Sequence, residues 1–132
     1  MLNFTLSELI YSDIAIKNNI NNMPDILALD NILNLIFYCL QPTRNLLARP
    51  MIITSGFRCA KLNELVKGSK NSSHLIGCAA DFKVKSCSVA NVIQIISNSD
   101  IEFDQLINEY DKWVHISYVK NKNRRQVLKV PK

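Results

Sequence analysis

The sequence has few of the residues that interrupt regular structure: only three glycines and four prolines occur among its 132 residues. It also contains no internal repeat and no low-complexity segment, so few positions mark a boundary between domains. Hydrophobic residues make up 48% of the chain and charged residues 20%, which is an ordinary globular composition and excludes an intrinsically disordered protein. A chain of this length is expected to form one domain, residues 1–132, with its own core.

Paired cysteines are also missing. The four cysteines, Cys39, Cys59, Cys78 and Cys87, include no Cys-x-x-Cys spacing. A disulfide framework therefore has little support, and we interpret the cysteines as reduced and mostly buried. Cys78 lies four residues after His74, within reach of a shared metal ion, but we interpret it as a small packing residue.

Neither a secretory leader nor a membrane span is predicted. The N-terminal segment MLNFTLSELIYSD lacks a basic region followed by an apolar one. The longest apolar stretch, Ile32–Leu40, is interrupted by Asn34 and is too short to cross a bilayer. We therefore expect a protein that is made in the cytoplasm without a signal peptide and that has no membrane partner. A target outside the membrane would require another protein to deliver it.

The chain carries a net charge of +5, which favours anionic surroundings such as nucleic acid or wall polymers. The basic residues are scattered until Lys120–Arg125, the run KNKNRR. We interpret this run as a solvated loop and expect no nucleic-acid partner. The contrary interpretation predicts a metal-independent affinity for DNA that falls steeply with salt.

The N-terminal part, residues 1–50, is predicted to be helical. Thr5 or Ser7 can cap a helix that runs to about Lys17. A second helix is expected to begin near Pro24 and to end at Pro42. Its apolar residues recur at helical spacing over most of its circumference, which predicts the central core helix; they are Ile26, Leu27, Leu29, Ile32, Leu33, Leu35, Ile36 and Leu40.

The remainder of the chain mixes strands with two further helices. The predicted helices are Ala60–Val66 and Val89–Ser97, the second capped by Ser88. The predicted strands are Met51–Thr54, Ala79–Val84, Phe103–Ile107, Trp113–Val119 and the edge strand Gln126–Val130. Leading helices followed by strands that are close in sequence predict a single α+β domain, in which the N-terminal helices pack on a small, mainly antiparallel sheet.

The sequence contains only two histidines, His74 and His115. Strand alternation places His115 on the less apolar face of WVHIS, and it turns Asp81 away from the apolar face of AADFKV. Two imidazoles and one carboxylate on the open side of a sheet are the ligand types of a catalytic zinc site. Spacing alone does not separate this site from ordinary polar residues, because His-x6-Asp with a distant histidine is no general zinc signature.

Longer strings resemble a known family. The run SGFRCAKLNELVKGSKNSSHLIGCAADF, followed by FDQLINEYDKWVHIS, resembles the M15 family of zinc peptidases. That family includes D-Ala-D-Ala carboxypeptidases and phage-encoded endolysins, and it shares its fold with the hedgehog signalling domain. Three motifs, SGxR, SxHxxGxAxD and WVHIS, occur in this order over Ser55–Ser117. The resemblance implies a hedgehog-like or DD-peptidase-like fold, with the metal site in residues 51–119.

The resemblance also implies roles for individual residues. His74 and Asp81 match the first two zinc ligands of the family and His115 matches the third, so one Zn²⁺ per chain is expected. Arg58 matches the arginine of SGxR, whose guanidinium suits a peptide carboxylate or an oxyanion. Ser72 matches the serine of the second motif and would orient a ligand or a substrate group.

The general base is the least determined role. Many family members carry an acid three positions before the last histidine, where this chain has Lys112. The hedgehog-type relatives carry a glutamate six positions before it, which selects Glu109 and leaves Asp111 as the reserve. Trp113 is a candidate wall of the substrate cleft, with burial in the core as the alternative.

The resemblance therefore predicts a zinc-dependent peptidase that hydrolyses peptidoglycan stem peptides, as a carboxypeptidase or an endopeptidase of phage type. Glu109 would take a proton from the attacking water and deliver it to the leaving amine. The enzyme is expected to be a monomer that acts on the cell wall during phage entry or host lysis. The alternative is a zinc-bearing module that binds wall peptide or protein without turnover, which the lysine at position 112 favours.

Overall fold

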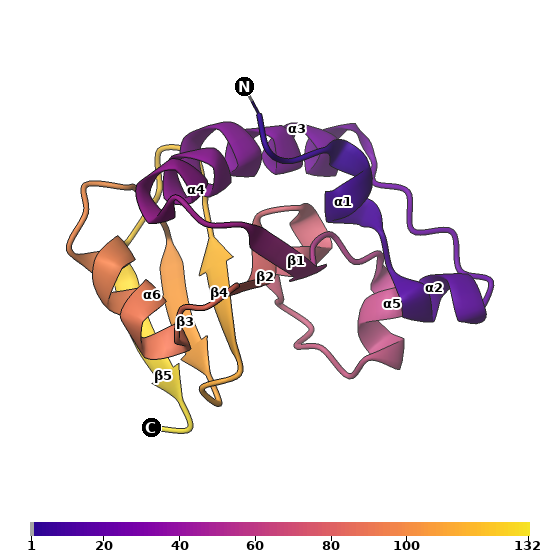
Figure 1. The fold of residues 1–132 in the computed structure, drawn as a ribbon. Coiled ribbons are helices and arrows are strands. Elements are labelled where there is room, and N and C mark those ends of the chain that lie inside the picture. The colour runs from indigo at the N-terminus through magenta and orange to yellow at the C-terminus, as the bar shows by residue number, and fades with distance from the viewer. Residues whose placement is uncertain (1) are drawn as a thin grey trace.

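The computed structural model describes residues 2–132, in which helices flank a single five-stranded sheet (Figure 1). This is the predicted α+β class. In chain order, the elements are α1 (Leu6–Ile10), α2 (Asp13–Lys17), α3 (Ile26–Leu35), the π-helical segment η1 (Ile36–Leu40), α4 (Gln41–Leu47), β1 (Met51–Ser55), α5 (Ala60–Leu65), the 3₁₀ turn η2 (Ser73–Ile76), β2 (Ala79–Val84), α6 (Val89–Ser97), β3 (Gln105–Glu109), β4 (Trp113–Ser117) and β5 (Gln126–Val130).

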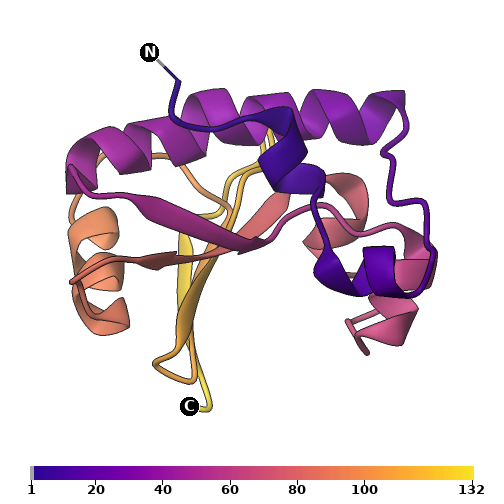
Figure 2. The ribbon, with the colours of Figure 1, turned by 45° about the vertical axis from the view of Figure 1, so that its right-hand side comes forward.

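The first predicted helix is in fact two short ones. Thr5 caps α1 in a capping box with Glu8. Tyr11 then leaves the helical conformation, with φ −58° and ψ 134°. The Ser12 side chain accepts a hydrogen bond from the Ala15 amide and so caps α2. The second cap redirects the chain, and α2 lies beside α5 instead of continuing α1 (Figures 1 and 2).

The predicted end of the second helix at Pro42 is wrong, because α3, η1 and α4 form one continuous helix. A proline inside a regular helix removes a hydrogen bond and its ring meets the carbonyl four residues earlier. Here the backbone widens into a π-turn just before the proline, where the Gln41 amide donates to the Ile36 carbonyl five residues back. The helix ends where Ala48 adopts a left-handed conformation, with φ 53°.

This continuous helix of 22 residues, Ile26–Leu47, is long and apolar enough to cross a membrane by length and composition. Its inner face, however, forms the core of this domain, with Ile32, Leu35 and Leu40 almost fully buried against the sheet. It is therefore the core helix that the sequence predicted. The prediction is wrong at its first turn, where Ile26 and Leu27 are 85% and 77% exposed.

The strand order of the sheet is β1-β2-β4-β3-β5, and every pair is antiparallel except β3 with β5. One face packs against the continuous helix and α6, through the buried side chains of Phe82, Leu106, Val114 and Ile116. The long helix runs along one side of the sheet in both views (Figure 2). The opposite face carries Asp81 of β2, His115 of β4 and Glu109 of β3, beside the apolar Ile107 and Trp113.

The basic run at Lys120–Arg125 is partly used inside the fold. Arg124 donates to both carboxylate oxygens of Asp104, at 2.9 Å each. The Arg125 guanidinium lies 4.7 Å from the centre of the Phe103 ring and donates to the Ile101 carbonyl. These two arginines hold the segment before β5 against the start of β3, which explains how a short strand joins the sheet edge.

Replacing Asp104 with asparagine is expected to lower the free energy of unfolding by about 1–2 kcal/mol at neutral pH, since Arg124 remains largely exposed. Hydrogen bonds from Arg124 hold the pKa of Asp104 below its ordinary value, although partial burial acts in the opposite direction. The stabilisation is therefore complete above about pH 4 and is lost as the pH falls through the lower pKa of the folded state. The free energy of unfolding, measured with urea at pH values above and below the pKa of Asp104, tests this prediction. The exposed neighbour Glu102, changed to glutamine, is the control, and a pH-independent difference would contradict the ion-pair account.

Candidate metal centre

Asp81 and His115 face each other directly across two neighbouring strands. The register of β2 and β4 pairs these two residues, so their side chains lie on the same face of the sheet. In the same way, β4 and β3 pair His115 with Ile107 and Trp113 with Glu109. Glu109 therefore lies on this face as well, two register pairs along from His115.

His74 reaches the same place from η2 and not from the sheet. The Ser72 hydroxyl accepts a hydrogen bond from the His74 amide and begins the turn. The turn ends at Gly77, whose φ of +78° favours glycine. A Cβ at Gly77 would stand 2.5 Å from the Ala28 carbonyl oxygen, so the turn packs directly on the core helix. The Arg58 amide donates to the His74 carbonyl at 3.1 Å and ties the turn to the strand-β1 side of the site.

The three side chains converge within metal-ligand distances. Asp81 Oδ1 lies 2.9 Å from His115 Nδ1 and 3.3 Å from His74 Nε2, and all three ligand atoms lie within 4.8 Å of one another. Ligands of a tetrahedral zinc ion, at about 2.0–2.1 Å from the metal, are separated by about 3.3 Å. The observed spacing therefore fits one divalent ion held by two imidazoles and one carboxylate, with a further coordination position available.

The orientation of His74 is set by a contact on the far side of its ring. Its Nδ1 lies 2.7 Å from the Gly56 carbonyl oxygen. A carbonyl only accepts, so Nδ1 carries a proton, which leaves Nε2 as the nitrogen that faces the other two ligands. Partners of this kind fix the tautomer of metal-binding histidines. His74 is 2% exposed, and its ring is thus held before any metal binds.

The charge of the site is concentrated on Asp81. Burial alone would raise the pKa of this carboxyl, but hydrogen bonds with His115 and His74 outweigh burial, and the pKa lies well below its usual range. Asp81 is therefore ionised throughout the physiological pH range and offers a cation a permanent negative charge.

The ligands open into a cavity of about 420 Å³, which we call the metal pocket. It is lined by the three ligands and by four other residues singled out in the sequence: Arg58, Ser72, Glu109 and Trp113. Asp111, the reserve base, is not among them. It lines a separate pocket, accepts a hydrogen bond from the Asn108 side chain and lies 3.9 Å from the Lys129 ammonium. The geometry thus favours Glu109.

Glu109 is half-buried, and its surroundings suit proton transfer. Burial raises the pKa of its carboxyl, and the neighbouring Asp81 charge acts in the same direction, while the two histidines oppose this shift. A carboxylate with a raised pKa is a better proton acceptor than one in water. Glu109 is the last residue of β3, and the register between β3 and β4 places Trp113 opposite it.

Two buried donors in the metal pocket have no acceptor within the described part of the chain. They are Arg58 Nε and Trp113 Nε1. The Arg58 guanidinium makes one side-chain hydrogen bond, from Nη2 to the Ser72 hydroxyl at 3.3 Å. Burial lowers the pKa of Arg58, whereas the charges of Asp81 and Glu109 raise it. The Trp113 indole nevertheless lies close enough to the Glu109 carboxylate to lower its pKa. Unpaired buried donors are costly, so a ligand that places an acceptor beside Arg58 Nε is favoured in this pocket.

Cys78 lies outside the ligand group. It is 3% exposed, and burial raises the pKa of its thiol to about 11. A buried thiol of this kind stays protonated, and the metal-binding group consists of the two histidines and Asp81 alone. This agrees with its interpretation as a packing residue.

Sequence reasoning missed Gln105, which also lines the metal pocket. The signal was present, because Gln105, Ile107 and Glu109 alternate along one strand and so share a face. The predicted strand, Phe103–Ile107, contains Gln105 but ends before Glu109, so the face that these two residues share was not part of the prediction.

Comparison with protein families places the chain beside a known peptidase family. Residues 2–117 match a family model described as Peptidase M15. The match begins before α1 and ends with β4, so it contains every residue that lines the metal pocket. A comparison with curated proteins gives no match.

Proposed function

Because the chain belongs to the peptidase M15 family, we propose that it is a zinc-dependent peptidase that hydrolyses peptide bonds of peptidoglycan stem peptides. The observation that carries this proposal is the convergence of His74, Asp81 and His115 on the floor of a pocket that also holds Glu109. Two imidazoles and a carboxylate with an open position form the ligand set of catalytic zinc.

Zinc held by these residues supplies a Lewis acid that polarises a carbonyl and lowers the pKa of water towards neutrality. The other steps belong to side chains of this chain. The Glu109 carboxylate accepts a proton from the attacking water and returns it to the leaving amine. Arg58 offers its unpaired Nε–H to the negative charge that develops on the carbonyl oxygen, or to a substrate carboxylate.

The remaining side chains position the substrate. Trp113 walls the pocket beside Glu109, and its indole N–H is a donor for that carboxylate or for a backbone carbonyl of the bound peptide. Ser72 holds the Arg58 guanidinium and begins the turn that presents His74. The net positive charge of the chain favours approach to anionic wall polymers. Both a carboxypeptidase and an endopeptidase are compatible with this pocket, and the products distinguish them.

The test is to incubate the zinc-loaded protein with a wall stem pentapeptide and with isolated walls, and to identify the products by mass spectrometry. Release of the terminal D-Ala is expected from a carboxypeptidase, and larger fragments from an endopeptidase. A chelator should stop the reaction and added zinc should restore it. Equal rates of cleavage with and without chelator would rule out the zinc mechanism, and intact substrates at full zinc loading would rule out the proposed substrate class.

A further inference from the structure

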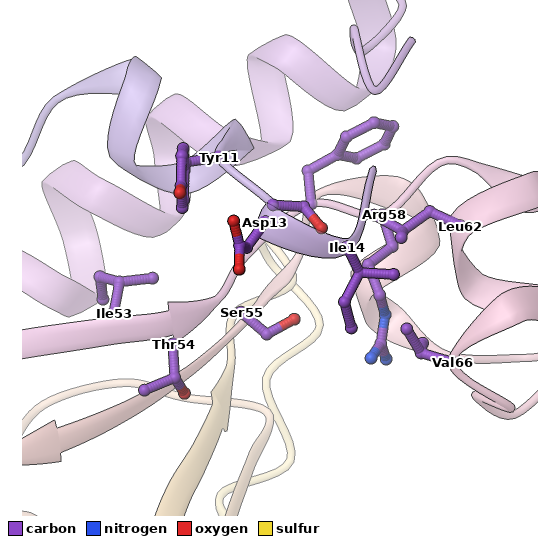
Figure 3. A pocket seen from close by; sticks show the side chains of 11 residues that line it. Tyr11, Asp13, Ile14, Ile53, Thr54, Ser55, Arg58, Leu62 and Val66 are labelled. Atoms are coloured by element: carbon purple, nitrogen blue, oxygen red, sulfur yellow. The ribbon is translucent and has the colours of Figure 1, made fainter. Parts of the chain in front are cut away.

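A second cavity, of about 340 Å³, lies on the other side of Arg58 (Figure 3). We call it the α2 pocket. Its main lining residues come from α2, from β1 and from the segment around α5; they are Asp13, Ile14, Ile53, Ser55, Arg58 and Val66. Arg58 lines this cavity and the metal pocket alike. The two cavities therefore adjoin at the Arg58 guanidinium, whose buried Nε has no partner in the described part of the chain.

The position of the α2 pocket matches that of a neighbouring substrate residue. Ser55 in its wall is the register partner of Asp81, one strand away from the metal ligands. Adjacent strands are about 4.8 Å apart, and an extended peptide advances about 3.3 Å per residue. A peptide whose reacting bond lies over the metal would thus bring a side chain one or two residues away into this cavity.

The walls are held in place independently of any ligand. The buried Asn22 side chain donates to the Ile10 carbonyl at 2.8 Å and to the Phe57 carbonyl at 3.0 Å, and accepts from the Cys59 amide at 2.8 Å. The Phe57 amide donates to the Leu9 carbonyl at 2.7 Å. These bonds fasten the segment before α2 to the loop that carries Arg58. Because the walls of the cavity are already ordered, the protein loses less conformational entropy when a ligand binds there.

The lining of the α2 pocket suits a ligand side chain that has an aliphatic stem and a cationic end. Ile14, Ile53 and Val66 provide apolar walls, and Asp13 supplies the acidic group of the lining. Its side chain projects from α2 towards the cavity, while the Arg58 guanidinium projects from the opposite side (Figure 3). Lys17 Nζ lies 3.2 Å from Asp13 Oδ2, so this carboxylate already pairs with an ammonium group of its own helix. Both side chains of this pair are largely exposed, which leaves the carboxylate free to exchange partners.

We propose that the α2 pocket is a specificity subsite for a substrate residue whose aliphatic side chain ends in an ammonium group, with Asp13 as its acceptor. This subsite rests on the proposed peptidase function. Arg58 repels a cation from the metal side and Asp13 attracts it at the α2 side, so the side chain has one favourable direction in the cavity.

The test compares a lysine-containing stem pentapeptide with the same peptide acetylated on the lysine side chain. Hydrolysis is measured for the zinc-loaded wild type, Asp13→Asn and Lys17→Met, with the exposed helix residue Asp30, changed to asparagine, as the matched control. Asp13→Asn is expected to lower kcat/KM for the free-amine peptide about fivefold and to leave the acetylated peptide unaffected. Lys17→Met should increase the preference for the free amine, because it removes a competing ammonium.

A binding measurement separates the subsite from the hydrolase proposal. Dissociation constants for the two peptides are measured with zinc-loaded Glu109→Gln, alone and combined with Asp13→Asn, by calorimetry. A preference for the free amine that disappears with Asp13→Asn supports the subsite even where no peptide is cleaved. Equal affinities for the free and acetylated peptides, or a preference that persists without Asp13, would overturn it. A helix-stabilising role of the Asp13–Lys17 pair alone would lower the melting temperature of both variants and leave discrimination unchanged, which also overturns it.

Discussion

Replacing Asp81 with alanine is expected to remove zinc binding and peptide hydrolysis together. The carboxylate lies next to both imidazoles and carries the negative charge of the site, so its loss removes a ligand and the charge that neutralises the cation. Mutation of a residue that only orients a metal ligand lowers metal affinity about 10–100-fold. Loss of a ligand should therefore lower it more than about 100-fold, and turnover at limiting zinc should fall with it.

Elemental analysis and a competitive zinc titration measure this effect on folded protein, with circular dichroism as the check on folding. Asp81→Asn serves as the second variant, because it keeps the shape of the side chain and an oxygen ligand while removing the charge. Asp100→Asn, an exposed carboxyl after α6, is the matched control and should keep one zinc per chain. Full zinc content in folded Asp81→Ala would show that the metal, if any, is held elsewhere.

Replacing Glu109 with glutamine is expected to lower kcat about 10²–10⁴-fold, the usual contribution of a positioned general base, while one zinc per chain remains bound. The amide cannot accept the proton from water, but it preserves the size of the side chain in the metal pocket. Asp111→Asn is the matched control, since this carboxyl lies two residues away and lines a different pocket. Steady-state kinetics beside metal analysis make the comparison.

The same pair of variants decides between the two candidate bases. A loss of kcat in Asp111→Asn with normal rates in Glu109→Gln would assign the proton transfer to Asp111 and contradict the geometric argument. One zinc per chain in the wild type, with no hydrolysis of any wall peptide and no change in Glu109→Gln, would favour a binding module without turnover. Lys112, which stands where the resemblance to the family implies an acid, would then be the residue to exchange.

Local patterns predicted the parts of the fold that depend on nearby residues. Strand β2 and helix α6 begin and end as predicted, because alternation and a serine cap are local signals. The prediction failed at Pro42, where a proline that usually ends a helix is accommodated by a π-turn. It also failed at Tyr11 and Ser12, where the chain leaves the helix and a second cap begins α2, although the predicted end near Lys17 is correct. In both places a hydrogen bond that the sequence pattern does not reveal decides whether the helix continues or a new one begins.

The amino-acid sequence by itself determined which side chains share a face and which ligand types the site contains. A period of two along a strand places His115 and Asp81 away from the core whichever strands are neighbours. Only the tertiary structure decided that β4 lies between β2 and β3, so that Asp81, His115 and Glu109 meet in one pocket while Asp111 points elsewhere. Strand order and register arise from packing between distant segments, and those contacts also place Arg58 between the metal pocket and the α2 pocket.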